Sequence, residues 1–340
     1  MTDGYDFPFN ALDCRPPFLL RDAIGRDADS LSALAIQVWL HTYATNGISP
    51  AIARHVLATY TTEQFLRWVN DPHYVLLVAL QRDSLIGFAL ASFNAAVPTA
   101  TTIPELLTLY VQPRFVGRGV GSALLHAMQD EATQRRGSSC LELSVHAENG
   151  SAIDFYRHHG FVEIGMTNFY LAEVAHKNLV LRGPAHAPQP AFDRIRAVRS
   201  GERASIAALI NETLHISVDA SVTEKTHFLS SMQNNLDWAC QHPEQCVHLV
   251  YLRAQNIVGV VLVKEYWNLS ALMVHPAAHR TGVGGALLEL AVARCRARST
   301  HGTIRLNASR NAVEFYLAQG FEIVEGASAL LRTTPMQMQL

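Results

Sequence analysis

The stretch VQPRFVGRGVGSALL at residues 111–125 decides how the chain must fold, because it returns as VHPAAHRTGVGGALL at residues 274–288. Eight of the fifteen positions are identical. A second block, SAIDFYRHHGF at residues 151–161, returns as NAVEFYLAQGF at residues 311–321. Both blocks keep their order and nearly their spacing, and solenoid repeats are only about 20–50 residues long. The repeat therefore indicates a duplicated domain.

Length and composition limit the classes of protein to which the chain can belong. Its 340 residues suffice for about two ordinary domains, and 49% apolar with 16% charged residues is typical of globular proteins. A net charge of −2 without long charged runs argues against nucleic-acid binding, which needs clustered Lys and Arg. No apolar run approaches the roughly 18 residues that span a bilayer, and no secretory signal is visible. We expect no nucleic-acid partner and no membrane partner.

The cysteines and histidines give no sign of a metal site or a disulfide framework. Five cysteines are an odd number and form no Cys-x-x-Cys pair, so we expect reduced thiols and a cytoplasmic protein. The sixteen histidines show no metal-ligand spacing such as His-Glu-x-x-His. We therefore expect no metal.

Pro- and Gly-rich segments divide the chain. Residues 1–17 form an irregular N-terminal extension, and the segment RGPAHAPQPA at residues 182–191 is typical of a linker. We expect a first domain at residues 18–182, a linker at 183–191 and a second domain at 192–340.

Apolar runs bounded by turn residues predict corresponding strands in both halves. The strands are expected at residues 74–80, 85–93 and 106–111, and again at 247–252, 257–264 and 269–274. Apolar residues at helical spacing follow each glycine-rich turn. The pattern predicts an α/β fold, a mixed sheet covered by helices, built twice.

A glycine-rich turn between a strand and a helix favours anion binding. The first N–H groups of a helix lack internal partners, and glycines let an anion approach the backbone closely. Neither turn carries the Gly-Lys-Ser/Thr of a Walker loop or the full dinucleotide fingerprint, which leaves the pyrophosphate of coenzyme A as the third reading. The candidate residues are Gly117, Arg118, Gly119 and Gly121 in the first half and Arg280, Thr281, Gly282, Gly284 and Gly285 in the second.

With these motifs the chain closely resembles the GNAT superfamily of acyl-CoA-dependent N-acyltransferases. That family shows Val-x-Pro after a strand, then Arg/Gln-x-x-Gly-x-Gly/Ala opening a helix, and later Asn-x-x-Ala-x-x-x-Tyr-x-x-x-Gly-Phe. The first half matches at Val111, Pro113, Gly119, Gly121, Asn149, Ala152, Tyr156, Gly160 and Phe161. The second half matches at Val274, Pro276, Gly282, Gly284, Ala312, Tyr316, Gly320 and Phe321. The resemblance spans nearly the whole chain and implies two tandem GNAT-like domains.

The resemblance also implies acetyl-CoA as the co-substrate and names the residues that would hold it. In the first half these are Leu109, Tyr110, Val111, Val116, Gly117, Arg118, Gly119, Val120, Gly121, Ser122 and Asn149. In the second half they are Met273, Val274, His279, Arg280, Thr281, Gly282, Val283, Gly284 and Gly285. The chain departs from the family where Val116 and His279 replace the usual Arg or Gln, and where Ser309 replaces the Asn.

The family's reaction is a direct attack of an amine on the thioester. An alkylammonium has a pKa near 10 and must lose a proton first. Glu105 holds a position at which related enzymes often place the general base, although a solvated strand-edge carboxylate is an equal alternative. Tyr156 and Tyr316 hold the position of the acid that serves the departing thiolate, the alternative being aromatic anchors of a helix.

Several functions remain open from the sequence. We expect an N-acetyltransferase that acts on a primary amine, either a small molecule or a peptide or protein N-terminus, as a monomer or homodimer. The alternative is an acyl-CoA-binding sensor or scaffold with one or both copies silent. Glu105 with Asn149 favours the first half as the catalyst, because Asn268 and Ser309 stand in their places in the second. The resemblance places acceptor recognition within residues 39–70 and 214–238.

Overall fold

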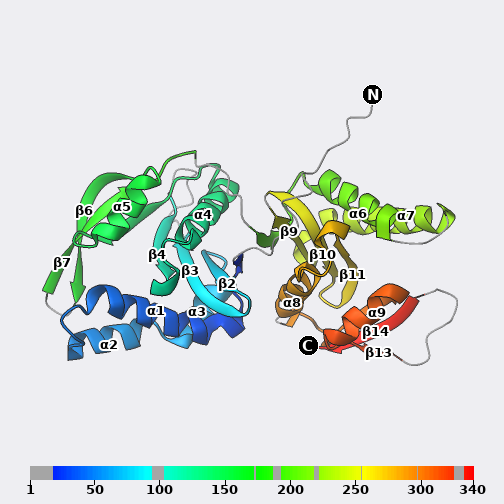
Figure 1. Cartoon of the computed structure of the whole chain (residues 1–340), viewed down its shortest axis with the longest axis horizontal. Helices are drawn as coiled ribbons and strands as arrows, with labels where there is room; N and C mark the ends of the chain where they lie inside the picture. Colours follow the sequence, from blue (N-terminus) through cyan, green and yellow to red (C-terminus); the bar gives the residue numbers. More distant parts are fainter. Residues whose placement is uncertain are drawn as a thin grey trace. The chain divides into compact units, whose positions relative to one another are not determined.

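The computed structural model describes residues 18–93, 103–171, 174–186, 193–217, 222–253, 255–296, 298–324 and 333–340. The chain divides into two compact units, residues 17–192 and residues 193–340. Each unit is described by itself, and Figure 1 labels the helices and strands.

The first unit is a mixed sheet with helices on both faces. Its strands pair in the order β1-β2-β3-β4-β5-β7-β6, and every pairing is antiparallel except β4 with β5. The strands are β1 (Leu19–Asp22), β2 (Tyr74–Gln81), β3 (Ser84–Ser92), β4 (Glu105–Val111), β5 (Glu142–His146), β6 (Val162–Leu171) and β7 (Val174–Arg182). The helices are η2 (Gly25–Asp27), α1 (Ala28–Tyr43), α2 (Pro50–Thr59), α3 (Thr62–Asn70), η3 (Pro113–Phe115), α4 (Val120–Arg136) and α5 (Gly150–His158).

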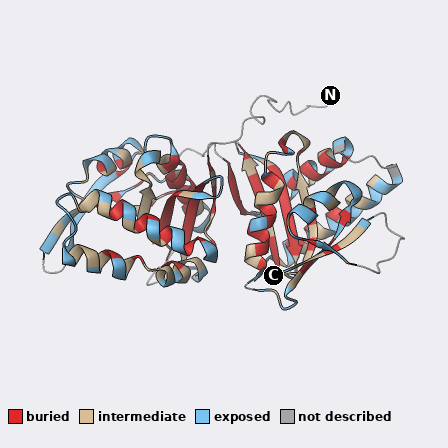
Figure 2. Cartoon of the chain, turned by 60° about the horizontal axis from the view of Figure 1, so that its bottom comes forward, coloured by how far each residue is buried: buried red, intermediate tan, exposed pale blue. Residues whose placement is uncertain are grey.

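Side-chain alternation along the central strands separates two cores. On β2, Val75, Leu77 and Ala79 pack with α4 and α5, whereas Leu76 and Val78 pack with α1, α2 and α3 on the other face. Successive strand residues point to opposite faces, so a strand covered on both sides is a continuous apolar run. Figure 2 shows the resulting burial along the strands and the inner sides of the helices.

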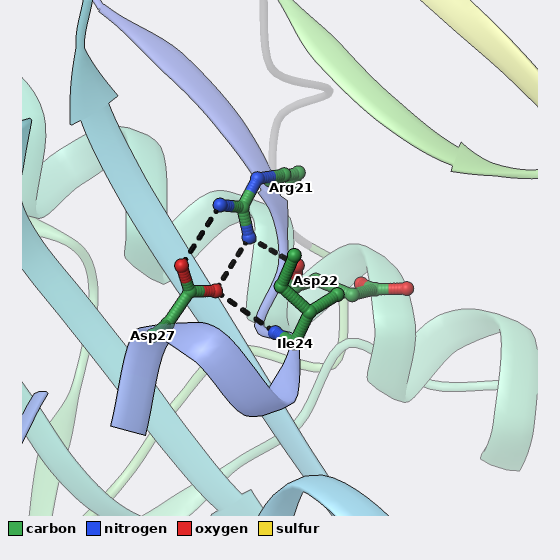
Figure 3. A network of polar contacts seen from close by, with 4 residues as sticks. All are labelled: Arg21, Asp22, Ile24 and Asp27. Carbon is green, nitrogen blue, oxygen red and sulfur yellow. Dashed lines mark hydrogen bonds and ion pairs between the residues drawn. The ribbon is translucent and has the colours of Figure 1, made fainter. Parts of the chain in front are cut away.

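A buried ion pair ties the first strand to the helix that follows. The Arg21 guanidinium donates to both carboxylate oxygens of Asp27, at 2.7 and 3.0 Å, and Asp27 also accepts from the Ile24 N–H at 2.8 Å (Figure 3). The second unit contains a corresponding ion pair, in which Arg196 donates to both carboxylate oxygens of Glu202. A two-pronged, charge-assisted contact of this kind fixes the chain direction between strand and helix.

The second unit has the same order of strands in its sheet, but two α-helices, α6 and α7, stand where the first unit has α1, α2 and α3. Its strands pair in the order β8-β9-β10-β11-β12-β14-β13, with β11 and β12 parallel. The strands are β8 (Arg194–Ala197), β9 (Cys246–Arg253), β10 (Asn256–Lys264), β11 (Asn268–Val274), β12 (Thr303–Ser309), β13 (Glu322–Ile323) and β14 (Thr333–Gln339). The helices are α6 (Arg203–Ser217), α7 (Val222–Gln241), η4 (Pro243–Gln245), η5 (Pro276–Ala278), α8 (Val283–Arg296), η6 (Arg310–Ala312) and α9 (Val313–Ala318).

These elements confirm the predicted α/β class, and the expected strands begin and end within one residue of the observed ones. The expected linker, residues 183–191, includes residues that pack with the first unit. Gly183 is buried and donates its N–H to the Leu141 carbonyl at 2.8 Å. Gly183 and the neighbouring Pro184, whose carbonyl accepts from the Ser139 hydroxyl at 2.9 Å, are therefore bound to the first unit. Residues 187–191 and the N-terminal extension lie outside the described residues.

Other sequence expectations concern groups spread along the chain. The four described cysteines are free thiols. Within the described ranges, no group of three or more His, Cys, Asp or Glu side chains could hold a metal ion. No described helix combines the length and apolarity that a membrane crossing requires.

Candidate active site

Strands β4 and β5 of the first unit separate along their length. Their parallel ladder contains one registered pair, Glu105 with Glu142, whereas the antiparallel β3 and β4 register at six positions. Toward their carboxyl ends both strands line a cavity, β4 with residues 109–111 and β5 with Ser144 and His146. The sheet therefore opens where the glycine-rich turn begins.

The cavity has a volume of about 1420 Å³ and lies within the first unit. It is lined by the glycine-rich turn, the ends of β4 and β5, and residues of α1, α2, α5, β6 and β7. Nine residues expected from the sequence to hold acetyl-CoA lie along it: Leu109, Tyr110, Val111, Val116, Gly117, Gly119, Gly121, Ser122 and Asn149. Of the other two, Val120 is buried in the core and Arg118 is exposed.

The turn between β4 and α4 presents free backbone donors. Gly117 and Gly119 adopt φ angles of 78° and 81°, in the left-handed region that favours glycine. The first bond within α4 runs from the Ala123 N–H to the Gly119 carbonyl, at 2.9 Å. The N–H groups of residues 120–122 precede that bond and have no partner inside the helix. A helix terminus with free N–H groups favours an anion, and Gly121 and Ser122 of this terminus line the cavity.

The Ser122 hydroxyl is already engaged within the unit. His159 Nδ1 lies 2.8 Å from the Phe155 carbonyl, so Nδ1 carries the proton that is donated there. In the neutral ring, Nε2 then accepts from the Ser122 hydroxyl at 3.0 Å. Ser122 therefore offers an anion its backbone N–H.

Tyr156 is the expected acid, and the structure places its side chain on the cavity wall. The residue is only 8% exposed, and burial raises the pKa of its phenol far above the usual value, with a smaller contribution from nearby Tyr43. The phenol consequently stays protonated at neutral pH and can donate a hydrogen bond. Tyr156 belongs to helix α5, which is capped at its first turn by Asn149 Oδ1 accepting from the Ala152 N–H at 3.2 Å.

Glu105, the expected base, does not join this group. It is exposed at the first position of β4 and is not among the described residues that line the cavity. Six residues separate it from Val111, which is about 20 Å of strand at roughly 3.3 Å per residue. Its registered neighbour Glu142 is held by Arg182 at 2.6 Å. The structure therefore separates Glu105 from the glycine-rich turn by the length of the strand.

Sequence reasoning missed part of the cavity wall. His146, Phe169, His176 and Asn178 line it from β5, β6 and β7. One local signal existed, because Ser144 and His146 alternate with the apolar Leu143 and Val145 and so mark a polar face of β5. The residues of β6 and β7 carry no such motif.

The second unit repeats the glycine-rich turn with a different side-chain setting. Arg280 and Gly282 adopt φ angles of 61° and 93°, which match Gly117 and Gly119. The first bond within α8 again leaves the N–H groups of residues 283–285 without a helical partner, since it runs from Ala286 to the Gly282 carbonyl at 3.0 Å. The backbone conformation of the turn is thus the same in both units.

Two side chains of this second turn form hydrogen bonds with backbone carbonyls nearby in the sequence. His279 Nε2 donates back to the Val274 carbonyl at 2.8 Å, and the Thr281 hydroxyl donates to the Ala278 carbonyl at 2.8 Å. Tyr316 is 8% exposed, and burial raises its pKa far above the usual value. Met273 packs against the core of this unit. His279 and Thr281 lie on the turn, Met273 lies on β11 and Tyr316 lies on α9, as their counterparts lie on the turn, β4 and α5 in the first unit.

The family models match both units. Residues 39–161 match the model described as the acetyltransferase (GNAT) family, and residues 215–340 match that of an acetyltransferase (GNAT) domain. Together the two matched segments cover more than half of the chain.

Individual relatives each match less than half of this chain. An uncharacterized N-acetyltransferase of Mycobacterium tuberculosis is 28% identical over 145 residues, which cover 43% of this chain and 89% of that protein. The N-alpha-acetyltransferase RimI of the same species is 32% identical over 106 residues, 31% of this chain and 63% of RimI. An uncharacterized N-acetyltransferase of Methanocaldococcus jannaschii is 41% identical over 61 residues, and only 26% of its length is matched.

Solved structures resemble about half of the chain. The PaiA N-acetyltransferase of Thermoplasma acidophilum in complex with coenzyme A is 20% identical, with a TM-score of 0.40, covering 49% of this chain and 98% of PaiA. A GNAT-family acetyltransferase of Streptococcus pneumoniae is 23% identical, with a TM-score of 0.40, covering 50% of this chain and 99% of that one.

Proposed function

Because the chain belongs to the GNAT family and is an N-acetyltransferase with two GNAT domains, we propose that its first unit transfers an acetyl group from acetyl-CoA directly to a primary amine. The observation that carries this proposal is the cavity of about 1420 Å³, which joins the glycine-rich turn, the opening between β4 and β5, and Tyr156. An anion site, a slot for the thioester arm and a buried donor thus share one space.

The glycine-rich turn would hold the pyrophosphate of acetyl-CoA. The free N–H groups of residues 120–122 and the positive end of the α4 dipole favour an anion there. Gly117 and Gly119 have open space where a side chain would start, so a phosphate can approach the backbone. The exposed Arg118, between Gly117 and Gly119, adds a positive charge to the turn.

Tyr156 would stabilise the departing thiolate. An ordinary thiol has a pKa of about 8.5, and the pKa of Tyr156 is raised above 10 by burial. Complete proton transfer from the phenol to the thiolate is therefore uphill, and a hydrogen bond donated to the sulfur is the favourable contribution. Such a bond strengthens as negative charge develops and lowers the barrier selectively.

Two groups compete for the proton of the amine. Glu105 remains the base proposed from the sequence, but its distance from the cavity requires a relay through water. His176 lines the cavity, makes no hydrogen bond with the residues that the structure describes, and needs no relay. Glu105→Gln separates the two, because it slows turnover by about 10²-fold or more only if Glu105 is the base.

The deciding experiment compares matched variants in the two units. With the full chain, acetyl-CoA and an amine that is turned over, Tyr156→Phe should lower kcat by about 10²–10⁴-fold, since it removes a positioned donor. Gly119→Glu should abolish CoA binding by the first unit through bulk and like charge, which calorimetry with CoA measures. Tyr316→Phe is the control in the second unit. If Tyr316→Phe abolishes turnover while Tyr156→Phe does not, the active unit is the second.

For the second unit we propose acyl-CoA binding without turnover. One observation favours it: Arg280 holds a left-handed φ of 61°, so the anion-binding backbone persists without its glycine. Ser309 and Asn268 stand where the first unit has Asn149 and Glu105. CoA titration should therefore give two sites in the full chain and one in Gly119→Glu.

A further inference from the structure

Six aromatic side chains form a closed circuit on the wall of the cavity. Consecutive ring centroids are 4.9 Å apart for Trp39–Tyr43, 5.1 Å for Trp39–His55, 5.4 Å for His55–Phe169, 6.4 Å for Phe169–His176, 5.6 Å for His146–His176 and 5.8 Å for Tyr43–His146. All six line the cavity. The circuit draws on helices α1 and α2 and strands β5, β6 and β7. Segments far apart in the sequence therefore build one aromatic enclosure.

The charge of the wall narrows what this enclosure can hold. Among the described residues that line the cavity, none is Lys, Arg or Asp, and Glu148, which is exposed, is the sole Glu. Burial lowers the pKa of His55, which favours its neutral form at neutral pH. A carboxylate on the ligand would find no guanidinium or ammonium group, and a polycation would find one carboxylate at most. The wall suits an uncharged, flat body.

A polar atom on the same wall lacks a partner. Asn178 lies opposite His146 in the β5–β7 ladder, and its side-chain Oδ1 is buried without a hydrogen bond to any described residue. A buried acceptor left unpaired costs about 1–3 kcal/mol, and a bound N–H donor would recover that cost. One wall thus combines aromatic faces with an acceptor for an amine or hydroxyl.

The circuit is coupled to the proposed site of chemistry through Tyr43. Its hydroxyl interacts with the Asn149 side chain, and it lies close enough to Tyr156 to contribute to the raised pKa of that phenol. Asn149 caps the helix that carries Tyr156. A ligand held in the circuit therefore lies beside Tyr156, the residue proposed to donate a hydrogen bond to the departing thiolate.

From these contacts we infer that the six-ring circuit is the acceptor site and that the acceptor is a small monoamine with an uncharged aromatic body. This inference rests on the proposed acetyl transfer. Aromatic rings pack against one another with centroids about 4.5–7 Å apart, the spacing that the circuit already shows. The body of the amine lies among the rings, and its nitrogen points toward the opening between β4 and β5. Amino acids and polyamines are excluded by their extra charges.

The first test uses the wild-type full chain and three amines. 2-Phenylethylamine should be acetylated with a kcat/KM at least about tenfold above that of phenylalanine, which differs by one carboxylate, and of spermidine, which is a polycation. A preference for phenylalanine or spermidine overturns the inference. Acetylation of spermidine alone would do so while leaving the proposed transfer intact.

The second test uses neighbouring residues on opposite faces of β6. Phe169 belongs to the circuit, whereas Tyr170 is 63% exposed and does not line the cavity. Phe169→Ala should raise the KM for 2-phenylethylamine about five- to tenfold and leave the KM for acetyl-CoA unchanged. Tyr170→Ala should change neither. Equal effects of the two variants contradict the inference.

Binding separates this inference from the proposed reaction. Calorimetry of 2-phenylethylamine with the full chain and CoA needs no turnover. Binding that Phe169→Ala weakens, without acetylation of any amine, would support the acceptor site and refute the proposed transfer. Absence of 2-phenylethylamine binding, together with acetylation of other amines, would refute the acceptor site alone.

Discussion

Gly87 on strand β3 lies beneath the first turn of helix α4, where no side chain fits. A Cβ there would be 2.9 Å from the Tyr110 carbonyl oxygen and 3.2 Å from Val120 Cγ1. We expect Gly87→Ala to lower the free energy of unfolding by about 1–3 kcal/mol, because a backbone oxygen cannot move aside cheaply.

Urea unfolding of the full chain checks this expectation by comparing single glycine-to-alanine variants. Gly165→Ala is the control, because a Cβ at Gly165 meets nothing within 4 Å. Gly259 occupies the corresponding place in the second unit, but its closest atoms are side-chain ends, Leu287 Cδ1 at 2.8 Å and Val283 Cγ1 at 2.9 Å. Gly259→Ala should therefore cost less than Gly87→Ala, and a larger cost would contradict the explanation.

At the scale of an element, the two units differ where helix α5 begins. Asn149 Oδ1 accepts from the Ala152 N–H, and α5 runs for 9 residues. The corresponding segment of the second unit starts with η6 and leaves 6 residues for α9, whose N-cap is Ala312 without a side-chain bond. The helix with the side-chain cap is thus α-helical from its first turn, whereas the uncapped one begins as a 3-10 turn.

The Asn149 cap predicts that two substitutions of this residue destabilise the chain to different degrees. Asn149→Ala should destabilise the chain by about 1 kcal/mol, the usual cost of a lost N-cap. Asn149→Asp keeps an accepting oxygen and should retain most of that stability, but it cannot donate to Tyr43. Thermal unfolding measures both. Equal losses would assign the effect to Tyr43 and not to the cap.

At the scale of the whole chain, the half-buried His248 predicts how stability depends on pH. Burial lowers the pKa of His248 to about 4, with the nearby Glu202 carboxylate opposing the shift. An unfolded histidine has a pKa of about 6.5, so between pH 6.5 and pH 4 the unfolded chain binds a proton that the folded chain does not. Stability should fall by up to about 3 kcal/mol over this window.

Thermal unfolding of the full chain between pH 7 and pH 4 tests the role of His248. His248→Gln should lose less stability over the window than the wild-type chain, and the exposed His301→Gln should behave like wild type. Glu202 adds to the acid loss. Burial raises its pKa, but the bonds from Arg196 and the Arg199 N–H outweigh burial and lower it, so its contribution disappears as the pH falls through that lowered pKa.

Local patterns predicted the fold and much of the site. Apolar runs bounded by turn residues located the strands, and nine of the residues that the family resemblance named for acetyl-CoA lie on the cavity wall. The aromatic circuit could not be predicted, because it joins side chains of α1, α2, β5, β6 and β7 that come together only in the folded unit. The position of Glu105 depends on the length of β4 and on where β5 leaves it, which no local pattern encodes.

At Arg280, a single substitution to glycine should stabilise the folded chain. Every arginine codon becomes a glycine codon by one base change, and glycine adopts the φ of 61° found there without the left-handed penalty. Arg280→Gly should raise the free energy of unfolding by about 0.5–1 kcal/mol, and Gly117→Ala in the first unit should lower it by a similar amount. Chemical unfolding of both variants measures the difference. The two units thus hold the same left-handed backbone shape at this position with different residues, glycine in one and arginine in the other.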